Sequence, residues 1–116
     1  MAAAAAVGFL AVAFGAFAAH GISDPKAKEW MHTGANYAFL HALGVFAAAY
    51  AASQGARGVR IVPPLFLGGV VIFSGSLFAM ALGAPRWFGA ITPIGGTLFL
   101  AGWAALAAGL IRKPQV

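Results

Sequence analysis

The sequence has no cysteine and only two acidic residues among its 116 positions. The lack of cysteine excludes a disulfide framework, a thiolate metal site and a cysteine nucleophile. Hydrophobic residues make up 62% of the chain and charged residues 8%. That composition is too apolar for an ordinary soluble domain and leaves no room for a second domain, so most soluble chemistry is excluded.

Charge is also missing from four long apolar segments, which are joined by short loops. Each segment is close to the ~20 residues that an α-helix needs to cross a ~30 Å hydrocarbon core. The sequence therefore predicts an all-α integral membrane protein, a four-transmembrane-helix bundle with antiparallel neighbours and short loops, forming one domain over residues 1–116. The apolar segments are Ala2–Ala19, Ala35–Ala52, Ile61–Leu82 and Ile91–Ile111. The expected helices run approximately over 2–20, 25–53, 62–82 and 92–111.

The first apolar segment resembles a secretory signal in hydrophobicity, but Met1–Ala6 carries no basic residue. We therefore expect a retained first helix. The second helix has a clear start, with Asp24 as N-cap and Pro25 as first residue. It is either continuous to about Ser53 or broken near Gly34 into an interfacial piece and a spanning piece. Thr92 followed by Pro93 predicts the same kind of start for the fourth helix.

The basic residues lie at the edges of the loops, which suits membrane flanks and does not form the clustered face that nucleic acid requires. The loop at 54–60 and the C-terminal tail hold four of them, and the other two loops hold three. The positive-inside rule therefore predicts that both termini face the cytoplasm. The four are Arg57, Arg60, Arg112 and Lys113, and the three are Lys26, Lys28 and Arg86.

Small residues repeat at a seven-residue period along all four apolar segments. Such stripes let helix backbones approach closely in lipid, and this period favours left-handed, near-antiparallel packing. An alanine- and glycine-rich composition can also produce such spacings by chance, most of all in the first helix. The predicted helix-packing positions are Gly15, Gly34, Gly44, Gly68, Gly75, Gly95, Gly102 and Gly109.

One ionisable residue, His41, lies well inside an apolar segment, and such residues are costly in a membrane. Counting residues from the membrane side of the first loop places Tyr37, Ser76 and Thr97 near the depth of His41, with His20 above them. These five residues form a predicted polar layer. Its favoured role is structural, with a neutral His41 hydrogen-bonded across helices to Ser76 or Thr97.

Three functional alternatives stay open for this layer. His20 and His41 could hold a metal or haem, although the chain has no cysteine and no carboxylate lies nearby, so no metal and no cofactor is predicted. A proton path would need an Asp or Glu within a membrane span, and none of the four apolar segments contains one. Catalysis would need Ser76 and His41 as nucleophile and base; no catalytic residue is predicted.

Two tryptophans, Trp30 and Trp87, fall where the apolar segments meet the interface, and we expect them to be interface anchors. Asn36 lies on a different face of the second helix from His41. It could serve a partner helix or a second protomer, or it could lie near enough to the interface to meet water.

Four segments in order resemble the YgdD-like family of small bacterial inner-membrane proteins of unknown function, which has small eukaryotic transmembrane relatives. The segment at 14–21 is similar to the family's GAFGAH, with Ala18 at a usual glycine. Trp30, Gly34, Tyr37 and His41 match W-x3-G-x2-Y-x3-H. The segment at 73–78 is close to FSGSLY, with Phe78 in place of tyrosine. The TPIGG run at 92–96 and AGW at 101–103 complete the match.

The resemblance implies a four-span protein of the bacterial inner membrane and brings no established activity. The expected partners are the lipid bilayer and a membrane protein or a second copy of the chain. We predict a small, non-enzymatic structural, accessory or assembly component acting by helix–helix contacts in a larger membrane complex. The alternative is an oligomeric transporter or channel for a small solute, with the polar layer around Tyr37 and His41 as its site.

Overall fold

The structure, a computed structural model, describes residues 1–112 and consists of helices joined by short loops. Each of the four long helices is long and apolar enough to cross a membrane. The predicted all-α membrane fold with four spans is therefore confirmed. The long helices are α1 (Ala2–His20), α2 (Pro25–Ser53), α3 (Val62–Ala81) and α4 (Thr92–Ile111), and the short 3-10 helices Val59–Ile61 and Arg86–Ala90 precede α3 and α4.

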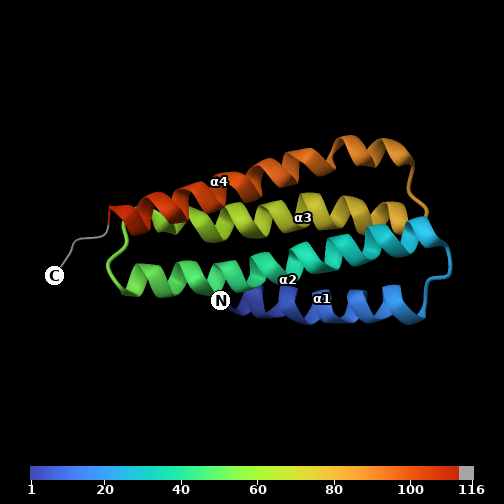
Figure 1. Ribbon diagram of the computed structural model, residues 1–116, viewed down its shortest axis with the longest axis horizontal. Helices are drawn as coiled ribbons and strands as arrows, with labels where there is room; N and C mark the ends of the chain where they lie inside the picture. Colours follow the sequence, from blue (N-terminus) through green and yellow to red (C-terminus); the bar gives the residue numbers. More distant parts are fainter. Residues whose placement is uncertain (113–116) are drawn as a thin grey trace.

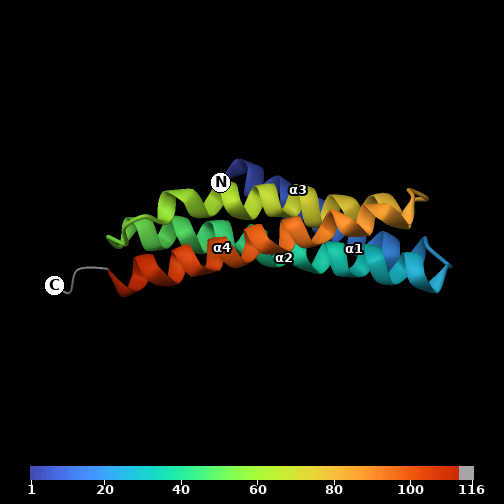
Figure 2. The same cartoon turned by 90° about the horizontal axis from the view of Figure 1, so that it is seen from above.

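The helices lie side by side in chain order, with α4 and α1 at the two outer positions (Figure 1). α1 packs on α2, α2 on α3 and α3 on α4, while α2 and α4 touch more lightly. All four follow the long axis, as the second view also shows (Figure 2). The described chain measures 54 × 25 × 18 Å. Because a hydrocarbon core is only ~30 Å thick, the helix ends reach the interface on both sides.

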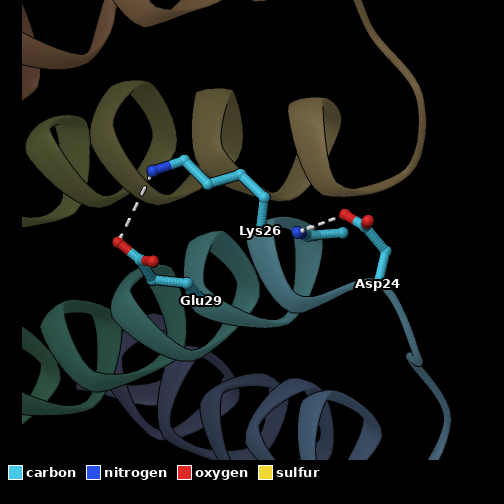
Figure 3. A network of polar contacts seen from close by, with 4 residues as sticks. Asp24, Lys26 and Glu29 are labelled. Carbon is cyan, nitrogen blue, oxygen red and sulfur yellow. Dashed lines mark hydrogen bonds and ion pairs between the residues drawn. The ribbon is translucent and has the colours of Figure 1, made fainter.

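The start of α2 is fixed by its cap. The Asp24 carboxylate accepts a hydrogen bond of 2.9 Å from the backbone N–H of Ala27 (Figure 3), and Pro25 is the first helical residue. The predicted start is therefore confirmed. α2 then continues without a break through Gly34 to Ser53. Its 29 residues span about 43 Å at 1.5 Å per residue, so its first turns extend beyond the hydrocarbon core.

Close contact between phenylalanine rings and glycines holds α2, α3 and α4 together. The fully buried Phe66 of α3 fits between Gly44 of α2 and Gly102 of α4. A Cβ atom at Gly44 would lie 2.6 Å from the Phe66 ring, and one at Gly102 would overlap the same ring. A single aromatic side chain thereby fixes the spacing of three helices, because interiors tolerate very little change in volume.

Candidate functional site

His41 is a buried polar residue of α2 in the helix packing. Its side chain is 2% exposed. The Nδ1 atom lies 2.7 Å from the backbone oxygen of Tyr37, one turn earlier in α2. The indole Nε1–H of Trp103, on α4, donates to His41 Nε2 across 3.0 Å. The His41–Trp103 hydrogen bond therefore joins α2 to α4, two helices that otherwise touch lightly.

The partners of His41 determine its tautomer. An indole N–H can only donate, so Nε2 of His41 must be the acceptor and carry no hydrogen. A carbonyl oxygen can only accept, so Nδ1 must carry the hydrogen and donate it to Tyr37. Both ring nitrogens are then occupied, and the imidazole is neutral. This arrangement leaves no lone pair for a metal or haem iron and no base for a nucleophile.

Aromatic rings surround His41 on most sides, and we call this group the aromatic cluster. The His41 ring stacks on Phe99, with ring centroids 3.6 Å apart and planes at 10°. Phe66 meets it edge-on at 5.0 Å, and Tyr37 packs on Phe73 at 4.8 Å. The preference of aromatic pairs for defined geometry makes the cluster a rigid connection between helices. Its members are Tyr37, His41, Phe66, Phe73, Phe99 and Trp103.

The predicted polar layer does not form as one unit. Ser76 makes a 2.6 Å hydrogen bond with the hydroxyl of Thr92 and also donates to the backbone oxygen of Phe73 at 2.9 Å. Thr97 donates to the backbone oxygen of Pro93 within its own helix, at 2.9 Å. The prediction that Ser76 or Thr97 is the partner of His41 was therefore wrong, since both hydroxyls have other partners.

Two further positions depart from expectation or fall outside the cluster. His20 is exposed at the end of α1, and its side chain forms no hydrogen bond within residues 1–112. Thr92 is the first residue of α4 and not its N-cap, which is Ile91. The Thr92 hydroxyl instead forms a link between α3 and α4 through Ser76. The polar contacts thus connect helices in pairs at separate places.

Ser74 is the polar residue that sequence reasoning missed. It is 1% exposed, and its hydroxyl donates to the backbone oxygen of Gly34 at 2.7 Å, which joins α3 to α2. A signal was present in the spacing. Ser74 comes four residues after Val70 and three before Leu77, and both are buried. That 4-3 spacing places it on the core-facing side of the helix.

The predicted packing glycines separate into three groups. Gly15 and Gly68 are half-buried, and a Cβ atom there would lie 3.8 Å from Ala35 and Leu98, an ordinary contact. Gly75 is exposed, with nothing within 4 Å of its Cβ position. The packing role predicted for Gly75 was therefore wrong in the folded chain, where Gly69 contacts Phe99 and α4 instead. The buried ones are Gly34, Gly44, Gly95, Gly102 and Gly109.

Both tryptophans that we expect to be anchors lie at the end of the molecule that carries the first and third loops. Trp30 has two cations over its ring, Lys26 at 5.8 Å and Arg86 at 5.6 Å from the ring centroid. Trp87 is 64% exposed, and its ring packs on Phe88 in a tilted arrangement, with centroids 4.5 Å apart and planes at 51°. Amphipathic rings with neighbouring cations are the residue types found at headgroup level.

Comparison with known proteins places the chain in a family. Residues 14–96 match the family model described as "Protein of unknown function (DUF423)". The "UPF0382 membrane protein" of Haemophilus influenzae is 45% identical over 94% of this chain and 90% of its own length. The "UPF0382 inner membrane protein YgdD" of Escherichia coli K12 is 40% identical over 94% of this chain and 86% of its own.

A third relative extends the comparison to another bacterial group. The "UPF0382 membrane protein YwdK" of Bacillus subtilis is 38% identical over 89% of this chain and 88% of its own length. No solved structure matches the chain. The matched residues include four members of the aromatic cluster, Tyr37, His41, Phe66 and Phe73. They also include the Ser74–Gly34 hydrogen bond between α3 and α2. The chain therefore belongs to the DUF423, or UPF0382, family of membrane proteins of unknown function.

Proposed function

We propose that the protein is a small accessory or assembly component that acts by helix–helix contacts within a larger membrane complex. One observation carries this proposal. Asn36 lies on the outer surface of α2, six residues and about 9 Å along the helix beyond Trp30. Its side chain forms no hydrogen bond within residues 1–112. An amide in hydrocarbon needs a partner, which another transmembrane helix can supply.

The surface around Asn36 suits a helix partner. A shallow groove of about 360 Å³ runs between α1 and α2. Its small side chains permit close approach of another backbone, and its polar groups can form hydrogen bonds between helices. α1 itself buries only Ala4, Ala11 and Ala18, so most of its surface stays open to the membrane. The residues that line the groove are Ala11, Val12, Gly15, Ala16, His32, Ala35, Asn36 and Phe39.

Cysteine cross-linking in membranes tests the proposal, because the chain has no cysteine of its own. Val12→Cys lies in the groove and is 64% exposed. Leu100→Cys, 73% exposed on α4, is the matched control. Both positions lie eight residues from the helix end on the same membrane side. A bifunctional thiol- and amine-reactive reagent should trap a partner at Val12→Cys and none at Leu100→Cys.

The role of Asn36 is tested in the Val12→Cys background. Asn36→Leu should reduce the cross-linked product, because leucine cannot form the amide hydrogen bond, while Asn36→Gln should retain part of it. A product of twice the chain mass identifies a second copy, and any other mass identifies a different membrane protein. Equal products at Val12→Cys and Leu100→Cys, or none at either, would contradict a contact surface on α1 and α2.

A second groove supports the alternative, a transporter or channel for a small solute. A groove of about 430 Å³ between α2 and α4 is lined by Tyr37, His41, Thr97 and Trp103 among others. The commitment of both His41 nitrogens to protein partners disfavours it. Thr97→Cys distinguishes the accessory role from the transporter or channel role. Labelling of this thiol by a small membrane-impermeant reagent in intact membranes would support a water-filled path, and protection from the reagent supports the accessory role.

We also propose that both termini face the cytoplasm. Arg57 and Arg60 lie in the loop between α2 and α3, and Arg112 follows the last residue of α4, all on the side of the molecule on which α1 begins. Lys113, the fourth basic residue counted for that side, falls outside the described residues. A single cysteine at Gln54 should be labelled by an impermeant thiol reagent only after the cells are permeabilised. Labelling on intact cells would place this loop outside.

A further inference from the structure

Three arginines come together at the end of the molecule where the α2–α3 loop meets the end of α4. Arg57, Arg60 and Arg112 are all exposed there. Figure 1 shows this end of α4 beside the α2–α3 loop, with α1 beginning well short of it. The only acidic residues of the sequence, Asp24 and Glu29, lie at the start of α2, at the opposite end. No carboxylate side chain therefore neutralises this basic end.

The chain holds Arg112 against the loop. Its Nη2 donates to the backbone oxygen of Arg57 across 3.3 Å. Gly58 adopts a φ of +73°, and a Cβ there would lie 2.8 Å from Nη2 of Arg112. A Cβ at Gly109 would lie 2.6 Å from the Arg57 oxygen, so only a glycine lets the loop approach α4 this closely. The two glycines thus bring arginines from separate segments together.

The opposite end has three basic residues as well, Lys26, Lys28 and Arg86, and the chain engages Lys26 and Arg86 internally. Lys26 lies 3.7 Å from the carboxylate of Glu29, as Figure 3 shows, and over the ring of Trp30. Arg86 lies over the same ring at 5.6 Å. Such contacts partly stabilise the positive charge of a cation. At the arginine end, within residues 1–112, the hydrogen-bond partner of Arg112 is a neutral backbone oxygen, which leaves the positive charge for an anion from outside.

We propose that Arg57, Arg60 and Arg112 bind the phosphate groups of anionic phospholipids. The depth of the three side chains selects lipid as the source of the anion. Arg60 lies two residues before the first residue of α3, and Arg112 directly follows the last residue of α4. Residues at the ends of apolar spans lie at headgroup level. The planar guanidinium group donates two parallel hydrogen bonds to one phosphate, which an ammonium group cannot do. This inference does not depend on the proposed function.

Spin-label spectroscopy of lipid at the protein surface tests this proposal. The purified chain is reconstituted in phosphatidylcholine vesicles with a trace of spin-labelled phosphatidylglycerol or spin-labelled phosphatidylcholine. The motionally restricted fraction of each label gives their relative association with the protein. The natural chain should favour phosphatidylglycerol by at least about fivefold, the order expected when one to several basic residues contribute. Added salt should weaken the preference.

Two triple variants show which end of the molecule contributes the lipid preference. Replacing Arg57, Arg60 and Arg112 by glutamine should bring the ratio of the two lipids close to one. Replacing Lys26, Lys28 and Arg86 by glutamine, the matched change at the opposite end, should leave most of the preference. Melting temperatures in detergent establish that both variants are folded. If the first variant does not fold, Arg60→Gln alone, at an exposed side chain, should still lower the ratio measurably.

Several results would overturn the assignment. An unchanged lipid ratio after loss of the three arginines means that they do not bind headgroups. An equal loss in both triple variants means that total charge, and not this site, determines the preference. Complete abolition of the preference by inorganic phosphate, at an ionic strength where chloride has little effect, identifies a site for free phosphate in place of lipid.

Discussion

The two outer helices, α1 and α4, carry similar sequence patterns and pack in different ways. Both have glycines seven residues apart, at Gly8 and Gly15 in α1 and at three positions from Gly95 to Gly109 in α4. A Cβ at Gly8 would meet nothing within 4 Å, and one at Gly15 would make only an ordinary contact. At each of these three α4 glycines a Cβ would come within 3 Å of a neighbouring atom.

The difference lies in what faces the glycine. Opposite the α4 stripe stand Phe73, Phe66 and Val59, whose backbone or side-chain atoms fill the space that a Cβ would need. Opposite Gly15 of α1 the neighbour is Ala35, and the buried residues of α1 are Ala4, Ala11 and Ala18. Small residues facing small residues allow close approach but create little interlock. Spacing alone therefore does not identify a tight interface; a large side chain on the other helix is also needed.

The largest expected effect is at Gly102. We predict that Gly102→Leu disrupts the packing of α4, because the added side chain must displace the Phe66 ring, which α2 confines from the other side. Overpacking of this kind costs about 3 kcal/mol or more when the backbone has to move. Thermal unfolding in mild detergent should show a large fall in melting temperature or loss of the folded protein.

Gly8→Leu is the matched control on α1, since its Cβ position is open. Its melting temperature should stay within the small range of surface substitutions, about 0.5 kcal/mol in stability. If Gly102→Leu melts like the natural chain, the glycine stripe of α4 is not a helix contact. If Gly8→Leu is as damaging as Gly102→Leu, the contrast between the two outer helices fails.

The next effect concerns the polar connection of α4, which α1 lacks. We predict that His41→Gln is tolerated better than His41→Leu, by about 1 kcal/mol. A glutamine oxygen can accept from the Trp103 indole, whereas leucine leaves this N–H without an acceptor. His20→Leu, at an exposed position on α1, should have little effect. Melting temperatures in detergent rank the three variants.

A double-mutant cycle with Trp103→Phe measures the His41–Trp103 hydrogen bond itself. The loss caused by His41→Leu should be smaller in the Trp103→Phe background, because no donor remains unpaired. Equal losses in both backgrounds would show that the two side chains are not energetically coupled. If both His41 variants fold normally and both abolish a measurable transport or metal-binding activity, the structural interpretation fails.

The membrane fold was predictable because its signals are local. An apolar run of about twenty residues, bounded by Asp24 and Pro25 or by Pro63 and Pro64, indicates a span whatever its neighbours are. The continuity of α2 through Gly34 could not be predicted from the same signals. At this glycine Phe78 of α3 covers the Cβ position and Ser74 of α3 donates a hydrogen bond to the backbone oxygen, contacts that the local sequence of α2 does not reveal.

The polar contacts were less predictable for a geometric reason. Counting residues gives the depth of a side chain, because each residue advances 1.5 Å along its helix. Depth does not say which neighbour the side chain faces, since that depends on how each helix is rotated in the packing. Ser76 has a suitable depth for His41 but turns toward Thr92. Trp103 of α4 supplies the donor to His41 instead.

A moderate effect is expected at Ser74, the link between the two inner helices. We predict that Ser74→Ala lowers stability by about 1 kcal/mol, near the middle of the range for hydrogen bonds between transmembrane helices. Thr97→Ala should cost less, because Thr97 bonds only to its own helix and is exposed. Equal effects of the two substitutions on the melting temperature would remove the distinction between contacts within and between helices.

The smallest effect, and the only expected gain, is at Gly75. This residue lies within α3, is exposed and has open space around its Cβ position. Alanine there should stabilise the helix by about 0.5 to 1 kcal/mol, because glycine loses more backbone freedom on folding. Gly69→Ala on the same helix is the opposite case, since its Cβ would lie 2.5 Å from the Phe99 ring and should lower the melting temperature. A fall in melting temperature for Gly75→Ala would show that this face is covered by another chain, which would bring α3 into the contact surface that we propose for α1 and α2.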